Sequence, residues 1–227
     1  MTIALAALAA AVLGALGALV LRRVPEPAEP DEDKVPYAVL AGTRFLVVGL
    51  AAGAAVMAAL VAWRIDHTEL LPVWVVVAGV GAWLAFVDSR TRLLPYVIVA
   101  PMYVVTLLLV GLGSLLLQDV DILVHALAAN VVVYLVFRLL HWFAGRFFGG
   151  AFGYGDVRLS GVLALALGAL GSSEVFIGIY AGFVLGAVVG ILLSRLRLID
   201  PKSYAFGPYM IVGAVIGATW GPAFYAT

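Results

Sequence analysis

The chain has 227 residues, of which 65% are hydrophobic and only 11% are charged, and its mean hydropathy is +1.15. These values exclude a soluble globular domain, whose surface needs far more charge, and they indicate an integral membrane protein. The formal net charge is zero and no basic block is present, so we expect no nucleic-acid partner. The absence of cysteine excludes disulfides and thiolate metal sites.

Eight apolar stretches separated by short charged clusters predict membrane-spanning helices. The predicted spans are residues 2–21, 38–63, 71–87, 96–117, 122–142, 157–171, 174–194 and 206–224. The first stretch is followed rather than preceded by basic residues, which is the reverse of a secretory signal, so we keep it as a span. We therefore expect an all-α polytopic membrane protein in which residues 1–227 form a single integral-membrane domain.

Basic residues fall almost entirely in one set of alternate loops. Lys and Arg accumulate in cytoplasmic loops, so this set is predicted to face the cytoplasm, with both termini outside. It contains, with the adjoining helix ends, Arg22, Arg23, Lys34, Arg44, Arg90, Arg92, Arg138, Arg146, Arg158, Arg195, Arg197 and Lys202. Only Arg64 falls in the opposite set, which carries the acids Asp66, Glu69, Asp119, Asp121 and Glu174.

No predicted loop is long enough to bury a core of its own, so any chemistry must lie in or beside the bundle. The first cytoplasmic loop, residues 22–36, is rich in proline and acidic residues and is typical of a solvated linker. Glycines at four-residue intervals in two later spans predict close helix packing rather than a nucleotide-binding loop. They are Gly182, Gly186 and Gly190 in one span, and Gly213, Gly217 and Gly221 in the other.

Two acidic residues differ from the loop acids in their position. Asp88 ends the third predicted span and Asp156 precedes the sixth, so both lie at the predicted cytoplasmic edge of the membrane. An ionisable group at that depth bears part of the desolvation cost of the bilayer, which makes it a functional candidate. The structural alternative is that Asp156 caps a helix and that Asp88 pairs with Arg90 or Arg92.

Two carboxylates on the same side of a helical bundle can share one site. If they approach within a few ångströms they cannot both ionise easily, so one stays protonated while the other acts as a base and activates water. This is the chemistry of aspartic proteases, and it needs no metal or cofactor. A dyad at the membrane edge reaches a peptide bond close to a membrane-inserted helix.

The residues around each acid favour a shaped site. Gly153 and Gly155 allow backbone conformations and close approaches that other residues resist. Asp156 follows them in the first turn of its helix, where the positive end of the helix dipole stabilises negative charge. Asp88 is followed by a short polar loop and then by Pro95, which is expected to set the start of the next helix.

Three pieces of the sequence resemble the type IV prepilin peptidases and their archaeal preflagellin relatives, which are GxGD aspartic membrane proteases. The first is Asp88 followed by a polar stretch and the Leu-Pro pair at residues 94–95. The second is GYGDVRL at residues 153–159, and the third is YAFGPYM at residues 204–210. With the multi-span layout, the resemblance covers roughly residues 70–220, the predicted peptidase core.

The resemblance implies an aspartic endopeptidase of the plasma membrane, without a cofactor, that removes the short basic leader of prepilin-like or pseudopilin-like proteins on the cytoplasmic face. It implies that Asp88 and Asp156 are the catalytic pair. Arg158 stands where the family usually has Lys, which keeps the charge. The residues expected to shape the site or bind substrate are Gly153, Gly155, Arg158, Pro95, Gly207 and Pro208.

Many bacterial members of this family also methylate the new N-terminus, and they use an enlarged first cytoplasmic loop with a cysteine metal site. Here that loop is the short acidic segment 22–36, and the chain has no cysteine. We therefore predict cleavage without methylation.

Two other functions remain as alternatives. Presenilin-like proteases share the Gly-x-Gly-Asp tetrad, but they place Tyr before the first Asp and Pro-Ala-Leu late in the chain, where this sequence has Val87 and the FGP of residues 206–208. A transporter with paired acids is the alternative from a different class, and it favours acids at mid-membrane. The mid-span polar residue here is Asn130, which is typical of an interhelical hydrogen bond.

The histidines do not predict a metal site. His67, His125 and His141 are scattered, and no two share a helix face at ligand spacing, which disfavours a zinc protease. His141 lies near the inner end of its predicted helix, which is a position close to the expected dyad.

Overall fold

The computed structural model describes residues 1–25, 35–147, 152–196 and 205–224, and every regular element within them is helical. The long helices are α1 (Thr2–Leu21), α3 (Leu46–Arg64), α4 (Leu71–Thr91), α5 (Tyr96–Leu117), α6 (Val120–Phe147), α7 (Tyr154–Gly168), α8 (Ser172–Arg195) and α9 (Gly207–Trp220). The short elements are α2 (Tyr37–Leu40) and the 3-10 helices η1 (Thr68–Leu70) and η2 (Gly221–Phe224). The predicted all-α class is confirmed.

The eight predicted spans each correspond to one long helix, but the helices are unequal. Six of them are long and apolar enough to cross a membrane: α1, α3, α4 together with η1, α5, α6 and α8. Helix α7 has 15 residues and α9 has 14, which is short for a full crossing. A multi-pass helical membrane protein is thus confirmed, whereas eight crossings stay a prediction.

The second predicted span begins at the wrong residue. Instead of one helix from residue 38, α2 ends at Leu40 and α3 begins at Leu46, after a turn in which Phe45 has a φ of 61°. A left-handed residue cannot continue a right-handed helix, so the chain starts a new one there. The interruption coincides with the Gly-Thr-Arg sequence at residues 42–44, which breaks the apolar run.

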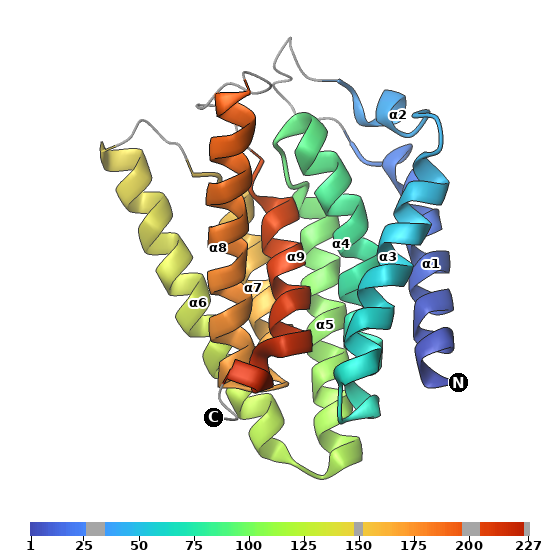
Figure 1. Cartoon of the computed structure of the whole chain (residues 1–227), viewed down its shortest axis with the longest axis vertical. Coiled ribbons are helices and arrows are strands. Elements are labelled where there is room, and N and C mark those ends of the chain that lie inside the picture. Colours follow the sequence, from blue (N-terminus) through green and yellow to red (C-terminus); the bar gives the residue numbers. More distant parts are fainter. Residues whose placement is uncertain (26–34, 148–151, 197–204, 225–227) are drawn as a thin grey trace.

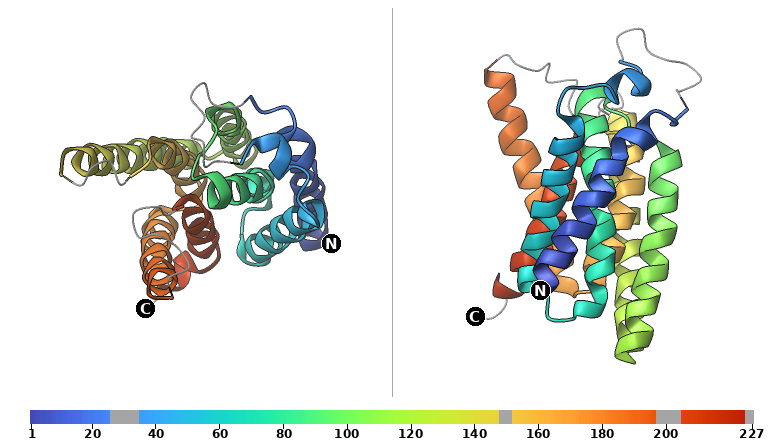
Figure 2. Two further views of the ribbon diagram at one scale, coloured as in Figure 1. Left: turned by 90° about the horizontal axis from the view of Figure 1, so that it is seen from above. Right: turned by 90° about the vertical axis from the view of Figure 1, so that its right-hand side faces the viewer.

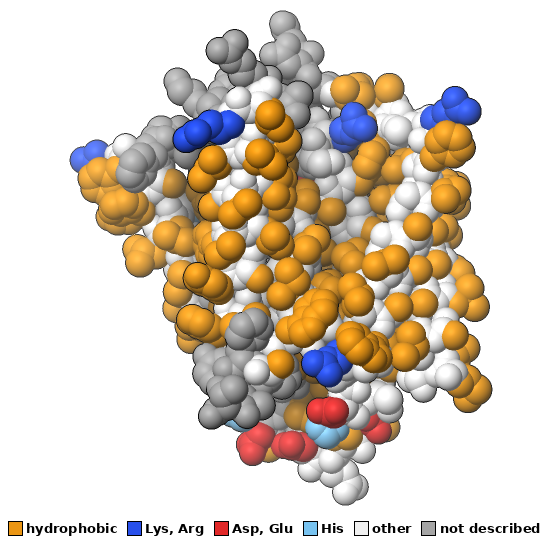
Figure 3. All heavy atoms as spheres, viewed as in Figure 1, with side chains coloured by type: hydrophobic (Ala, Val, Ile, Leu, Met, Phe, Trp, Pro, Cys, Tyr) orange, Lys and Arg blue, Asp and Glu red, His pale blue; other side chains and the backbone are white. Residues whose placement is uncertain are grey.

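Charge is segregated along the bundle. The start of α1 and the end of α9 lie at the same end of the molecule (Figure 1). On the face drawn in Figure 3, the acidic side chains gather at that end and most Lys and Arg side chains lie at the other. This matches the loop pattern that predicts the orientation, although the side of the membrane that each end faces stays a prediction. Most of the predicted linker at residues 22–36 lies outside the described residues, as do Lys34, Arg197 and Lys202.

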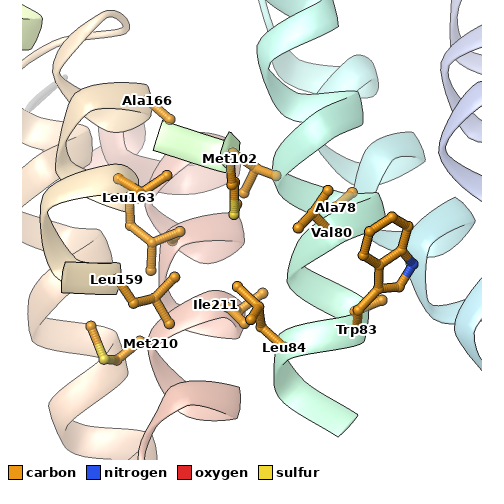
Figure 4. Close-up of a cluster of buried hydrophobic side chains, with 14 of the residues drawn as sticks. Ala78, Val80, Trp83, Leu84, Met102, Leu159, Leu163, Ala166, Met210 and Ile211 are labelled. Carbon is orange, nitrogen blue, oxygen red and sulfur yellow. The ribbon is translucent and has the colours of Figure 1, made fainter. Parts of the chain in front are cut away.

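The centre of the bundle is formed by α4, α7 and α9. From Asp156 to its end at Gly168, helix α7 is buried except at Arg158, and only its first turn, at Tyr154 and Gly155, is more exposed. Figure 4 shows the apolar contact among the three helices, with Leu84 of α4, Leu159 and Leu163 of α7 and Ile211 of α9 pointing toward one another. Each of these leucines and the isoleucine is fully buried. The three helices that carry the three sequence motifs are therefore held together by one shared apolar core.

The first helix packs against this core through a tryptophan. The indole N–H of Trp83 in α4 lies 3.1 Å from the carbonyl oxygen of Leu13 and 2.9 Å from that of Gly14, both in α1. Gly14 is pressed against α3, where a Cβ would lie 2.6 Å from the carbonyl oxygen of Leu50. Helix α1 is thus an integral part of the bundle.

Helices α8 and α9 meet through glycines. A Cβ placed on Gly213 would lie 2.5 Å from the amide nitrogen of Gly182 and 2.6 Å from the carbonyl oxygen of Gly178. The backbones approach so closely only because both helices carry small residues at this face. The predicted packing role is confirmed for Gly182 and Gly213 and also for Gly217 and Gly221, which contact the α8 backbone near Gly178 and Glu174.

The sequence pattern predicts the wrong environment for one acidic residue. Glu174, expected in a solvated outer loop, is only 7% exposed and lies in the first turn of α8. Its Oε2 accepts a hydrogen bond from the Ser173 hydroxyl at 2.7 Å. The reason is the packing of η2: Gly221 approaches so closely that its Cβ would lie 2.8 Å from the Cα of Glu174.

The glycine contact yields a stability prediction. Replacing Gly213 by Ala forces α8 and α9 apart, because the added methyl meets backbone rather than a movable side chain. We expect Gly213→Ala to lower the free energy of unfolding by about 1–3 kcal/mol, measured by thermal unfolding in detergent. The matched control is Gly49→Ala in α3, where nothing lies within 4 Å of the new Cβ. Equal unfolding temperatures for the two variants would contradict the packing role.

Candidate active site

Asp88 lies in the last turn of α4 with only 4% of its surface exposed. The helix ends directly after it, because Arg92 adopts a φ of 56° and donates its N–H to the Asp88 carbonyl at 2.7 Å. The Asp88 carboxylate turns the other way, and its Oδ2 accepts the backbone N–H of Gly207 at 2.9 Å. Gly207 is the first residue of α9, so the positive end of that helix faces the carboxylate.

Gly207 has no room for a side chain. A Cβ at this position would lie 2.8 Å from the Oδ2 of Asp88 and 3.4 Å from a methyl carbon of Leu94. Glycine is therefore required here for close approach rather than for an unusual backbone angle. The predicted site-shaping role of Gly207 has a direct geometric basis, and the next residue, Pro208, lies within the first turn of α9, where proline is well tolerated.

Asp156 lies three residues after the N-cap of α7 and is 9% exposed. Its carboxylate accepts the backbone N–H of Gly153, the N-cap residue. This is the reciprocal half of a capping box, in which the third helical residue reaches back to the N-cap. Gly153 borders it closely, since a Cβ there would lie 3.0 Å from the Asp156 Oδ2. Asp156 therefore does act as a helix cap, as the structural alternative proposed. That role does not account for its burial, because a cap can work while exposed to solvent.

The two carboxylates share one site. The two lie close enough for their like charges to repel each other, and each accepts a backbone N–H at the start of a helix, α9 for Asp88 and α7 for Asp156. Within the described part of the chain neither Arg90 nor Arg92 pairs with Asp88, and the Arg90 guanidinium lies instead over the ring of Phe86 at 5.9 Å. The ion-pair alternative for Asp88 is therefore wrong.

Leu94 holds the two glycine turns at a fixed separation. A Cβ on Gly155 would lie 2.9 Å from the Cβ of Leu94, and Leu94 also contacts the Gly207 position. The following residue, Pro95, is the N-cap of α5 and accepts N–H groups from Ile98 and Val99 with its carbonyl, as its predicted role at the helix start requires. The Leu-Pro pair therefore joins the Asp88 loop to both other motifs.

Arg158 points away from the two acids. Its guanidinium lies 4.5 Å from the ring centre of Tyr96 and 4.7 Å from that of Tyr154. Arg138 of α6 lies 5.3 Å from the same Tyr154 ring, and the Tyr154 hydroxyl is 3.1 Å from that of Tyr134. Such contacts hold cations against aromatic faces. The structure thus places Arg158 in an aromatic group beside the α7 start and gives it no contact with the carboxylates.

Residues 74–191, more than half of the chain, match the model of the type IV leader peptidase family. The chain belongs to this family. It is 34% identical over 185 residues to the prepilin leader peptidase/N-methyltransferase of Pseudomonas putida, an alignment that covers 77% of this chain and 59% of that relative. No solved structure matches it. The family match contains Asp88 and Asp156 and ends before Gly207.

Four phenylalanines in this family member form a cluster beside the site. Phe152 lies 5.7 Å from Phe137 of α6 and 5.9 Å from Phe206, and Phe183 of α8 lies 5.3 Å from Phe206, measured between ring centres. Phe152 directly precedes Gly153, and Phe206 directly precedes Gly207. The cluster therefore ties both glycine turns to α6 and α8. Sequence reasoning missed it, because the four residues are far apart in the chain and share no periodicity.

His141 is brought to the same turn. Its Nδ1 lies 2.7 Å from the Phe152 carbonyl oxygen, and its ring lies 5.3 Å from that of Tyr154. His141 therefore braces the turn that precedes Asp156, and its closeness to the two carboxylates themselves stays a prediction. Among the described residues no three His, Asp or Glu side chains gather in a way that would hold a metal ion.

Asn130 forms the interhelical hydrogen bonds that the sequence predicts. Its amide donates to the Gly161 carbonyl in α7 at 2.7 Å, and its Oδ1 accepts from the hydroxyl of Tyr103 in α5 at 3.2 Å. The residue is 8% exposed and its polar atoms are occupied by these partners. This buried polar residue therefore links α5, α6 and α7.

Proposed function

We propose that this chain is an aspartic endopeptidase of the plasma membrane that removes the leader peptide of type IV prepilin-like proteins at the cytoplasmic face. The observation that carries the proposal is the burial of Asp88 and Asp156 in one site where their charges interact. Membership of the type IV leader peptidase family supports the leader-processing activity. The chain spans 59% of the length of the Pseudomonas putida relative, and the substrate class is proposed on that partial likeness.

The proposed reaction uses one protonated and one ionised carboxylate. Two acids in a water-poor site hold one proton between them more easily than they carry two charges. The ionised carboxylate takes a proton from a water molecule, whose oxygen attacks the carbonyl carbon of the scissile bond, while the protonated acid donates to the carbonyl oxygen. Collapse of the tetrahedral intermediate breaks the C–N bond, and the leaving amine takes a proton from the carboxyl that acted as base. One hydroxyl of the intermediate returns its proton to the other carboxylate, so the pair again holds one proton.

The backbone donors fix the two acids for this reaction. The N–H of Gly207 holds Asp88, and that of Gly153 holds Asp156, so each carboxylate keeps one oxygen occupied and presents the other. Rigid placement of this kind reduces the reorganisation that the reaction would otherwise require. Gly155 and Leu94 pack against each other next to these donors. Pro95, Pro208 and the basic Arg158 lie around them.

The cytoplasmic placement is part of the proposal. The end of α4 that bears Asp88 also bears Arg90 and Arg92, and the α7 start lies beside Arg138 and Arg158. Basic residues at one end of a bundle indicate the cytoplasmic side. With both termini outside and residues 70–220 as the peptidase core, the dyad faces the compartment in which a prepilin leader is synthesised.

The dyad is tested by replacing each acid with its amide. We expect Asp88→Asn and Asp156→Asn each to lower cleavage of a model prepilin by at least about 100-fold, because Asn keeps the shape but can neither donate nor accept the catalytic proton. Cleavage is measured in membranes at matched protein levels. The control is Asp121→Asn, an exposed acid in the first turn of α6, which should cut like the wild type. Normal cleavage by either amide variant would exclude that aspartate from the reaction.

Gly207 is tested by adding one methyl group. Gly207→Ala places a Cβ 2.8 Å from the Asp88 oxygen, so the carboxylate must move. Because a misplacement of about 1 Å lowers a catalysed rate by about 100-fold, we expect kcat to fall by up to about 100-fold and far more than substrate binding weakens. The control Gly111→Ala in α5, with nothing within 4 Å of the new Cβ, should leave cleavage unchanged. Equal activity of both variants would show that the Gly207 contact does not position Asp88.

We further propose that the chain cleaves without methylating the product. Its first cytoplasmic loop is short and acidic, and the chain has no cysteine to form a metal site there. Mass spectrometry of a prepilin processed by the purified protein with S-adenosylmethionine present should show the mature N-terminus without an added methyl group. A product heavier by one methyl group would overturn this proposal, but it would not bear on the catalytic roles proposed for Asp88 and Asp156.

A further inference from the structure

A large apolar groove lies between α6 and α8 at the level of the membrane. Its volume is about 950 Å³, and its walls come from the facing sides of the two helices, with the end of α7 as part of its floor. Figure 1 and the view from above in Figure 2 both show α6 and α8 diverging. Val132, Phe176 and Tyr180 line the groove and are each about 60% exposed, so it is open on its lipid side.

The groove leads to the candidate active site. Phe137 and Phe183 line one end of it, and the same two rings contact the ring cluster that includes Phe152 and Phe206. Those last two residues immediately precede the glycines that hold Asp156 and Asp88. The phenylalanine cluster therefore connects the groove to both glycine turns.

The shape and lining of the groove suit a helix. Along α6 it extends from His125 to Phe137, a rise of about 18 Å for an α-helix. Gly168 and Ala129 pack against each other and form the floor where α6 meets the end of α7, and the exposed small residue Ala128 in the wall leaves room for another backbone to approach closely. In lipid no hydrophobic effect drives helices together, so they associate through close backbone approach at small residues.

We infer that this groove binds the apolar transmembrane helix of the substrate. The inference rests on the proposed function and assigns the substrate's position. A helix lying along α6 and α8 ends against the phenylalanine cluster, and the chain that leaves it on the dyad side passes the two glycine turns. The peptide bond at that end of the helix is then the one presented to Asp88 and Asp156, which explains how a bond is selected by its distance from an apolar segment.

The first test is site-specific crosslinking in an uncut complex. A photoreactive benzoylphenylalanine replaces Val132 in the groove or its neighbour Val131, which is 54% exposed but lies outside the groove. Both are placed in the Asp156→Asn background, and a model prepilin with its leader and apolar helix is the probe. We expect at least tenfold more adduct with the prepilin helix from position 132 than from position 131. Equal yields, or adducts only with lipid or with a second copy of the chain, would overturn the inference.

The second test fills the groove. Ala128→Trp places a large ring in the groove, whereas Leu127→Trp places the same ring on another face of α6. With equal thermal stability of the two variants, we expect Ala128→Trp to cleave the membrane-inserted prepilin at least tenfold more slowly and Leu127→Trp to cleave it normally. Equal cleavage by both would overturn the inference. If the wild type does not cleave the prepilin at all, the proposed function is wrong. In that case the crosslinking experiment alone decides whether the groove binds the helix.

Discussion

The hydrogen bond from the Gly207 N–H to Asp88 is the interaction on which the arrangement of the site depends. A carboxylate at 4% exposure in a membrane protein needs a fixed donor, and the start of α9 supplies one together with the positive end of its dipole. The same solution is used a second time at Asp156 with the N–H of Gly153. Each donor lies on a glycine, and a Cβ there would lie 2.8 Å from the Asp88 oxygen at Gly207 and 3.0 Å from the Asp156 oxygen at Gly153, closer than an ordinary contact.

Packing at a distance from the acids makes this arrangement rigid. Helices α4, α7 and α9 share one apolar core, so the turn after α4 and the starts of α7 and α9 cannot move independently. Leu94 then fixes the spacing between the two glycine turns, and the phenylalanine cluster connects them to α6 and α8. The chemistry requires two acids near each other, and the helices bring them together from positions 68 residues apart in the chain.

The sequence predicts the parts of this site better than their contacts. The all-α class, the multi-pass character and the packing glycines follow from hydropathy and four-residue spacing, which are local signals, and the predicted membrane depth of Asp88 and Asp156 marks them as candidates. The contacts of Leu94, the phenylalanine cluster and the groove each bring together residues from separate helices and turns, and no local pattern reports such contacts. The sequence pattern wrongly predicts an exposed position for Glu174 for the same reason. Its burial depends on the tertiary approach of Gly221. The break before α3 is marked only by the short Gly-Thr-Arg interruption at residues 42–44, and the left-handed conformation of Phe45 that turns the chain has no signal in hydropathy.

The two short helices explain why site and groove occur side by side. At 15 and 14 residues, α7 and α9 are about 22 Å and 21 Å long, less than the hydrocarbon core of about 30 Å. Their neighbours α6 and α8 have 28 and 24 residues and extend further. Figure 1 shows that α9 begins below the upper end of α8, and its first N–H, on Gly207, reaches Asp88 in the last turn of α4. A helix too short to cross the hydrocarbon core can begin at the depth of an interfacial peptide bond, where its unpaired N-terminal N–H groups are available to an acid.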